Sequence, residues 1–486
     1  MSACTRRGFL AGAAMALAGP VMPQNARVLP NFLFILIDDM GWRDLGSYGS
    51  TFYETPNIDR LAAQSVRFTN AYAACPVCSP TRASILTGKY PARLHITDWI
   101  PGRKQFPTAR LLTPRPPEFK HELPLEETIL PQVLKPLGYA SASIGKWHLG
   151  GPSFYPDKHG FDLNVGGTEK GQPSSYFGPW DLPNLQGGAK DDYLTDRLTL
   201  EAEKFIEANR ARPFFLYLPE FAVHLPKQGK SDLVEHYRAK ADQNNPQHDP
   251  VYAAMIGSLD ENVGRILKKL EDLGLAERTV VILMSDNGGV EFQGKQPQVI
   301  TSNAPLRAGK GHIYEGGIRE PMLIRWPGVT RPGAVCETPV ISVDFFPTML
   351  EMAGAPVPKV DGASLVPLLR GGSIRRDAIY WHYPHYSDQG GYPAGAVRVG
   401  DYKLIEFFED GRLELYNLAK DIREADDLSQ RDPQRAARMH RILKRWRESV
   451  GAVMPRPNPA FDPAHAHEGL TGENPKPKEG AENGRR

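Results

Sequence analysis

Short runs of apolar residues recur along the first three quarters of the chain, each about the length of one strand. They cover residues 31–37, 139–144, 213–218, 279–284 and 321–326. Continuous apolar character is typical of strands covered on both faces, as in a parallel sheet flanked by helices. Segments that fit helices lie between them, at residues 57–64, 125–137, 191–209 and 251–273. The pattern predicts an α/β fold in which helices sandwich a large, mainly parallel sheet.

The pattern changes after about residue 370. Short strand-like segments joined by tight turns follow, and then a helical segment, at residues 378–383, 396–400, 402–408, 412–416 and 434–450. We therefore predict a main α/β domain over residues 27–370 and a smaller α+β domain over residues 371–450, with a short antiparallel sheet and a helix. Residues 451–486 are rich in proline and charge, which predicts a disordered tail.

The N-terminus resembles an export signal. Arg6-Arg7 precedes Phe9-Leu10, and a small apolar run follows at residues 11–18. That run is shorter than the roughly 20 residues needed to span a membrane. The order of these features predicts a twin-arginine signal peptide over residues 1–26, with a merely basic tail as the alternative. We expect the twin-arginine machinery to export the folded protein to the periplasm or beyond. No later apolar run is long enough to anchor the chain in a membrane.

Bulk composition limits the classes of partner. The chain has 486 residues, of which 41% are apolar, so it can bury a sizeable core. A formal net charge of +2 argues against a nucleic-acid-binding protein. Four cysteines, one of them in the leader, do not make a disulfide framework. Any affinity for anions must therefore come from a local cluster of residues.

Polar side chains follow two of the predicted strands. Asp38-Asp39 comes directly after residues 31–37, and Asp286-Asn287 follows residues 279–284. The carboxyl ends of parallel strands share one edge of a sheet, so these side chains should converge there. Three carboxylates repel one another unless a cation neutralises them, and oxygen ligands favour Ca²⁺, or Mg²⁺, over zinc. Taken alone, either pair has an alternative role in capping the next helix.

Cys78 lies in the segment Cys-Ser-Pro-Thr-Arg, which continues to Leu86-Thr87-Gly88-Lys89. We expect a helix here, with Ser79 as the N-cap and Pro80 at the first helical position. Together with Cys75 it forms a C-x-x-C pair, a pattern also found in redox and zinc sites. The only other cysteines are Cys4 and Cys336, which leaves a zinc site without suitably spaced ligands.

This segment resembles the modification signal of the type I sulfatases, arylsulfatase-like members of the alkaline phosphatase superfamily. In that family a maturation enzyme oxidises the cysteine of C-x-P-x-R to formylglycine (3-oxoalanine). Cys78, Pro80 and Arg82 fill the fixed positions, whereas Thr81 stands where Ser or Ala is usual. The resemblance covers roughly residues 30–428. It includes three further segments, Gly-Lys146-Trp-His148-Leu-Gly, the histidine at His224, and Lys310 before Glu315-Gly-Gly-Ile-Arg319.

The resemblance implies a site and a mechanism. It implies metal ligation by Asp38, Asp39, Asp286, Asn287 and the formylglycine at position 78. It implies a sulfate pocket lined by Arg82, Lys146, His148, His224 and Lys310, with Arg307 and Arg319 as secondary candidates. A hydroxyl of the hydrated formylglycine would attack sulfur while His224 protonates the leaving oxygen. His148 would then take a proton so that the aldehyde reforms and sulfate leaves.

The expected substrate is a sulfated carbohydrate or an aryl sulfate. Trp99, His382, His385 and Tyr386 are candidates for a sugar subsite, although packing is the commoner reason for such a cluster. The nearest rival function is a formylglycine-dependent phosphonate or phosphate ester hydrolase. A rival of another class is a non-catalytic protein that binds sulfated glycans and retains an unmodified Cys78.

Overall fold

The computed structural model describes residues 29–102, 115–291 and 300–459. The predicted signal peptide lies outside these residues, as does the predicted tail from residue 460 onward. None of the helices within the described ranges is long and apolar enough to cross a membrane.

Nine strands form the main sheet, and four of the five predicted apolar runs pair side by side in parallel. The order across the sheet is β4-β3-β5-β1-β6-β7-β2-β8, with β9 beside β2. The strands are β1 (Asn31–Ile37), β2 (Val66–Tyr72), β3 (Ala140–Ile144), β4 (Leu163–Val165), β5 (Phe214–Pro219), β6 (Thr279–Ser285), β7 (Arg319–Arg325), β8 (Val335–Cys336) and β9 (Val340–Ile341). Only β7 runs antiparallel to its neighbours, β6 and β2. The predicted α/β class is confirmed.

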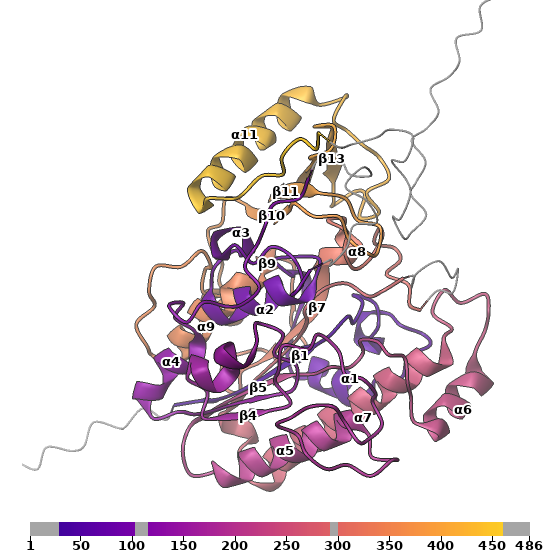
Figure 1. Cartoon of the computed structure of the whole chain (residues 1–486), viewed down its shortest axis with the longest axis vertical. Coiled ribbons are helices and arrows are strands. Elements are labelled where there is room, and N and C mark those ends of the chain that lie inside the picture. Colours follow the sequence, from indigo (N-terminus) through magenta and orange to yellow (C-terminus); the bar gives the residue numbers. More distant parts are fainter. Residues whose placement is uncertain (1–28, 103–114, 292–299, 460–486) are drawn as a thin grey trace, which may run out of the picture.

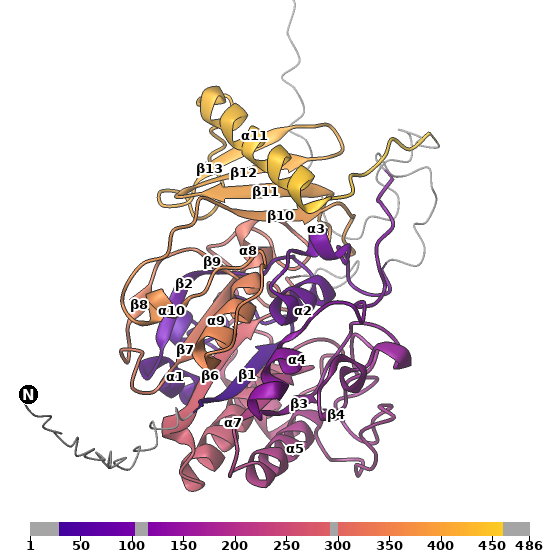
Figure 2. The same ribbon diagram turned by 90° about the vertical axis from the view of Figure 1, so that its left-hand side faces the viewer.

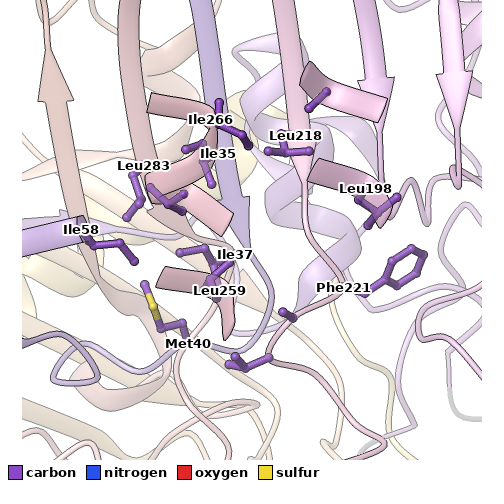
Figure 3. Packing of buried hydrophobic residues seen from close by; sticks show 14 of the residues in the cluster. Ile35, Ile37, Met40, Ile58, Leu198, Leu218, Phe221, Leu259, Ile266 and Leu283 are labelled. Carbon is purple, nitrogen blue, oxygen red and sulfur yellow. The ribbon is translucent and has the colours of Figure 1, made fainter. Parts of the chain in front are cut away.

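Helices cover both faces of this sheet (Figure 1). Alternate residues of β1 point to opposite faces, so Ile35 and Ile37 belong to one apolar cluster and Phe34 and Leu36 to another. The first cluster includes side chains of α1 (Pro56–Ala63), α5 (Leu194–Ala208) and α7 (Pro250–Asp272). Figure 3 shows part of it, with Leu218 and Leu283 of the neighbouring strands near Leu259 and Ile266 of α7. The second includes α2 (Cys78–Thr87), α4 (Leu130–Leu134) and α9 (Phe345–Ala353).

A separate antiparallel sheet follows, as the change in pattern predicts. It contains β10 (Ile379–Tyr383), β11 (Ala394–Val399), β12 (Tyr402–Phe407) and β13 (Leu413–Asn417), in that order. The helix α11 (Pro433–Val450) crosses one face of this sheet (Figure 2). A third apolar cluster, which includes Tyr72 and Trp381, joins the two sheets.

The remaining helices are short or connect these elements. They are α3 (Pro91–Leu94), α6 (Ser231–Lys240), α8 (Glu315–Ile318) and α10 (Val366–Leu369). The apolar pattern did not predict β2, because a register shift between Phe68 and Ala71 interrupts its alternation. It did not predict α6 either, because that helix buries only Val234 and Tyr237. The helix predicted at residues 125–137 is shorter than expected and consists of α4 and a following 3-10 turn.

Candidate active site

Several segments meet at one edge of the main sheet. Four of them follow the carboxyl ends of β1, β3, β5 and β6, which are neighbours in the order β3-β5-β1-β6. Ligands bind at this edge in open α/β sheets. Because β7 runs in the opposite direction, it is the start of β7 that lies here, preceded by α8 and the segment that carries Lys310.

Cys78 begins α2 and is buried at this edge. The helix starts two residues earlier than the sequence predicts, at Cys78 rather than Pro80, with Val77 as its N-cap. The predicted capping role of Ser79 is therefore wrong. The Ser79 hydroxyl instead donates to the carbonyl of His148 at 2.9 Å and accepts from the amide of Ile100 at 3.1 Å. Ser79 thus ties α2 to the segments that carry His148 and Ile100.

His148 faces Cys78. Its Nδ1 lies 3.3 Å from Cys78 Sγ, and its Nε2 contacts the carbonyl oxygen of Ile100. Because a carbonyl only accepts hydrogen bonds, Nε2 carries the proton and Nδ1 presents a lone pair to position 78. Burial, and then the charge of Lys146, keep the pKa of His148 well below its ordinary value. The ring is therefore a neutral acceptor aimed at the thiol.

Arg82 and Lys146 neutralise one pair of carboxylates. Arg82 Nε donates to Asp286 Oδ2 at 2.9 Å, and Lys146 Nζ donates to Asp38 Oδ2 at 2.5 Å. All four side chains are fully buried. Burial, and next the Asp286 carboxylate, raise the pKa of Asp38 above its ordinary value. Charge balance here depends on the two cationic side chains.

Asp39 lies at the centre of a second group. Lys310 Nζ is 2.6 Å from Asp39 Oδ1, Asn287 Nδ2 donates to the same oxygen at 2.8 Å, and His224 Nε2 lies 3.5 Å from Oδ2. Although burial acts to raise it, Lys310 and then His224 hold the pKa of Asp39 below its ordinary value. Burial, and then Lys310, lower the pKa of His224 to about 3. The structure thus brings together the residues predicted to hold the metal and the five primary residues predicted for the sulfate pocket.

The oxygen atoms suit a hard cation. Asp38 Oδ1 and Asn287 Oδ1 are buried and have no hydrogen-bond partner among the described residues. Buried oxygens without partners are costly, and a cation would satisfy them. Ligand atoms of Asp38, Asp39 and His224 lie within 4.8 Å of one another, so His224 joins this group by geometry. One carboxylate oxygen of Asp286 already accepts from Arg82, and the other accepts from the amide of Asp39 at 3.3 Å.

Comparison with known proteins identifies the family. The model of the family described as Sulfatase matches residues 30–355, which is more than half of the chain. The chain belongs to the sulfatase family. It is accordingly a sulfuric ester hydrolase. A second model, described as N-sulphoglucosamine sulphohydrolase, C-terminal, matches residues 308–449.

Individual relatives agree with the family. This sulfatase is 34% identical to a sulfatase of Formosa agariphila, over 88% of this chain and 91% of that protein. It is 36% identical to the human N-acetylgalactosamine-6-sulfatase, over 73% of this chain and 68% of the relative. The structure of Ps i-CgsB in complex with k-i-k-neocarrahexaose matches with a TM-score of 0.73 and 28% identity, over 86% of this chain and 93% of that one. These findings do not favour the phosphonate hydrolase or the non-catalytic alternative.

The sulfatase buries most of the residues considered for a sugar subsite. His382, His385 and Tyr386 are only 3%, 3% and 2% exposed. His385 Nε2 lies 2.9 Å from the Thr97 hydroxyl, and Tyr386 donates to Glu409 at 2.8 Å. The His385 contact joins the small unit to the segment after α3, and the Tyr386 contact lies within the small unit, so these positions favour packing roles. Trp99 is half-buried and follows Asp98 on the segment that leads to Ile100.

The secondary candidates Arg307 and Arg319 point away from the pocket residues. Arg319 pairs with Glu315 at 3.3 Å, and Arg307 donates to the Tyr416 hydroxyl at 3.1 Å.

Sequence reasoning missed Asp44, which is fully buried and fixes the segment after Asp38-Asp39. Its carboxylate accepts from the Gly41 amide at 2.8 Å and from the hydroxyls of Tyr252 and Thr301, each at 2.7 Å. The only available signal was its place five residues beyond Asp39.

Proposed function

We propose that this sulfatase releases inorganic sulfate from a sulfated carbohydrate, using a formylglycine at position 78 and one divalent cation, with Ca²⁺ as the expected ion. The single observation that carries the proposal is the contact between Cys78 and His148. The side chain at position 78 faces an unprotonated imidazole nitrogen at 3.3 Å, inside a group of buried acids and cationic side chains. Aryl sulfates are an alternative substrate for the same site.

Four side chains fit the role of holding the cation. Asp38, Asp39, Asp286 and Asn287 offer oxygen atoms, and two of those atoms have no partner among the described residues. A hydrated formylglycine supplies a nucleophilic hydroxyl, and a divalent ion supplies Lewis-acid charge neutralisation. Arg82 holds one Asp286 oxygen, so it fixes the orientation of that carboxylate. The donor set is all oxygen, which favours Ca²⁺ or Mg²⁺.

Lys146 and Lys310 provide the positive charge for the sulfate oxygens. Both ammonium groups contact aspartates of the metal group, at 2.5 Å for Lys146 and 2.6 Å for Lys310. Charges fixed in a buried site need little reorganisation during reaction and stabilise the transition state strongly. The Lys310 side chain is 11% exposed, whereas that of Lys146 is fully buried. Lys310 is therefore placed nearer the entrance for substrate.

Two histidines move protons. His224 Nδ1 donates to the Leu225 carbonyl at 3.0 Å, so Nε2 is the nitrogen that exchanges a proton with the substrate oxygen. Its pKa is low beside Lys310, and the negative charge of a bound sulfate ester raises the pKa toward the range of an acid catalyst. His148 Nδ1 accepts a proton from the side chain at position 78. The two histidines thus act on different groups, His224 on the leaving oxygen and His148 on the side chain at position 78.

We also propose that the enzyme acts outside the cytoplasm, in the periplasm or beyond it. The twin-arginine pattern of Arg6-Arg7 supports export, and a maturation enzyme would convert Cys78 before the folded chain leaves the cytoplasm. An exported enzyme meets sulfated polysaccharides or oligosaccharides. The human relative is named for N-acetylgalactosamine 6-sulfate, and Ps i-CgsB was solved with a carrageenan-type oligosaccharide, which supports a sulfated carbohydrate here.

The test is release of inorganic sulfate by purified, matured enzyme. Ion chromatography would measure sulfate from a sulfated galactosamine, a carrageenan oligosaccharide and an aryl sulfate, with an aryl phosphate diester as the competing substrate class. We expect sulfate release from at least one sulfate ester, with a kcat/KM well above that for the phosphate diester. A preference for the diester would contradict the proposal. His224→Ala is the matched inactive control, because it removes the proton donor.

A further inference from the structure

The segment that presents Lys310 is held from both ends by the small sheet. The backbone of this segment is tied to the site, since the Lys310 amide donates to Gly289 O at 3.1 Å and the Gly311 amide donates to Pro76 O at 2.8 Å. Its two ends are Arg307 and Glu315, whose side chains leave the site and enter the interface with the small sheet. Figure 2 shows α8, which begins at Glu315, directly below that sheet.

Glu424 contacts both ends of the segment. Its Oε2 accepts from the Glu315 amide at 2.6 Å, and its main-chain carbonyl accepts from Arg307 at 2.9 Å. Its Oε1 lies 2.9 Å from Lys403 Nζ, which also donates to Glu315 Oε1 at 2.9 Å. The side chains of Lys403, Glu315 and Glu424 are all fully buried. Glu424, in the segment that follows β13, thus connects both ends of the Lys310 segment.

Other contacts close the same loop. The Arg307 guanidinium lies 3.8 Å from the centre of the Tyr314 ring, and the Arg307 carbonyl accepts from the Gly316 amide at 2.9 Å. Gly391, in the loop between β10 and β11, approaches so closely that a Cβ there would lie 1.7 Å from the Gly311 carbonyl oxygen. The small sheet therefore contacts the residue next to Lys310 as well as both ends of its segment.

Buried charges of this kind need a reason other than stability. Removing two charges from water costs about as much as their attraction returns, so a buried ion pair contributes little net stability over apolar packing. What such a buried group does provide is a fixed orientation of the side chains that form it. An ammonium that neutralises charge in a transition state loses most of its effect when it moves by about 1 Å.

We propose that Glu424 is a positioning residue for Lys310. The side chain of Glu424 holds the Glu315 amide, and its main-chain carbonyl holds the Arg307 side chain. Together these contacts keep the intervening loop rigid and Lys310 against Asp39. The small sheet then forms part of the catalytic framework, although none of its residues enters the pocket described above. This inference rests on the proposed function of Lys310 at the sulfate.

The test is a double-mutant cycle on matured enzyme with an activated aryl sulfate. We expect Glu424→Ala to lower kcat/KM by about 10- to 100-fold, and Glu424→Gln to recover much of this loss because it keeps an acceptor for the Glu315 amide. In a Lys310→Ala background, Glu424→Ala should lower kcat/KM by no more than about 3-fold, because the group it positions is gone. Full, additive losses in both backgrounds would overturn the inference.

Two further variants keep the test decisive. Arg447→Met removes the partly buried pair with Glu406 inside the small unit, so it measures the effect of general destabilisation and should leave kcat/KM within about 3-fold. If Glu424→Ala does not fold, Tyr416→Phe removes only the hydroxyl that accepts from Arg307, and its smaller loss should also vanish in the Lys310→Ala background. Additivity of Tyr416→Phe would contradict the inference in the same way. Unchanged activity of Lys310→Ala by itself would instead contradict the proposed function.

Discussion

Arg82 contacts one oxygen of Asp286 with two of its nitrogens. Nε lies 2.9 Å and Nη2 2.7 Å from Asp286 Oδ2, and both side chains are fully buried. Nη1 donates to the carbonyl of Lys146 at 2.9 Å. One side chain from α2 therefore joins the carboxyl ends of β3 and β6, between the residues proposed to hold the metal and those proposed to bind sulfate.

Loss of the Arg82 guanidinium should destabilise the fold as well as the site. Arg82→Ala leaves the Asp286 carboxylate buried without its cationic partner, whereas Asp38 keeps Lys146, so we expect the free energy of unfolding to fall by about 3–5 kcal/mol. Arg82→Lys keeps the charge but cannot make contacts in three directions, so it should lose less stability while still losing most activity. Urea unfolding measures the stability of both variants, and sulfate release measures their activity. An Arg82→Ala variant as stable as the parent would show that the pair is not needed to neutralise the acids.

Lys146 should matter for catalysis far more than a lysine on the surface. Lys146→Ala removes a buried charge next to Asp38. We expect kcat to fall by about 10²- to 10³-fold, the range found when a buried transition-state contact is lost. Lys158→Ala is the matched control, because Lys158 is 53% exposed and pairs with Asp157 at the surface. Equal activities of the two variants would show that Lys146 does not act in the proposed sulfate pocket.

A divalent ion should stabilise the folded enzyme measurably. Binding to the native state alone raises stability by about 2.7 kcal/mol at an ion concentration 100 times Kd. Chelator-treated enzyme should therefore unfold at a lower temperature and lose activity. Both properties should return with added Ca²⁺ or Mg²⁺, and their titration midpoints identify the preferred ion. Asp39→Asn should weaken the thermal response, whereas Asp272→Asn on the surface should not. A melting temperature indifferent to every added divalent ion would contradict the proposed metal site.

Glu220 should make the fold less stable as the pH rises. Burial, and then Asp196, raise the pKa of Glu220 to about 8, and its Oε2 has no partner in the part of the chain that the structure describes. Between its ordinary pKa and about 8 the folded state keeps a proton that the unfolded state has released. Its stabilising contribution is therefore complete at low pH and is lost as the pH rises through 8, by at most about 1.4 kcal/mol per pH unit.

The measurement is urea unfolding at about pH 5 and about pH 8 for the parent and Glu220→Gln. Gln cannot ionise, so the variant should lose less stability over this range than the parent does. Identical pH dependences would show that Glu220 does not titrate as its burial indicates. The comparison is internal, so other titrating groups cancel.

The apolar runs of the sequence were enough to predict the α/β class and the central strands. Runs such as residues 31–37 and 279–284 are buried on both faces, and this produces a continuous signal. Strand β2, which lies between β7 and the short strands β8 and β9, carries polar residues and a register shift, so its pattern is mixed. Strand direction was also beyond the pattern, because β7 is an apolar run like β6 but runs antiparallel to it.

The site could be predicted where side chains follow strands, since topology alone places Asp38, Asp39 and Asp286 together. The contacts that hold these side chains in place could not be predicted from the sequence. The carbonyl of Ile100 sets the tautomer of His148, and Glu424 lies 109 positions beyond the Glu315 amide that it accepts from. Such partners are ordinary residues in the sequence, and only folding makes them neighbours. The capping role expected of Ser79 failed for the same reason, because its hydroxyl had better partners in other segments.

The mass of the peptide that contains Cys78 tests the central claim most directly. Trypsin cleaves after Arg67 and Arg82 and releases the peptide from Phe68 to Arg82, which mass spectrometry resolves in its two forms. Formylglycine is lighter than cysteine, because an aldehyde oxygen replaces sulfur and two hydrogens are lost. We predict that specific activity rises in proportion to the converted fraction across preparations with different maturation. Full activity in a preparation with only the cysteine form would contradict the account.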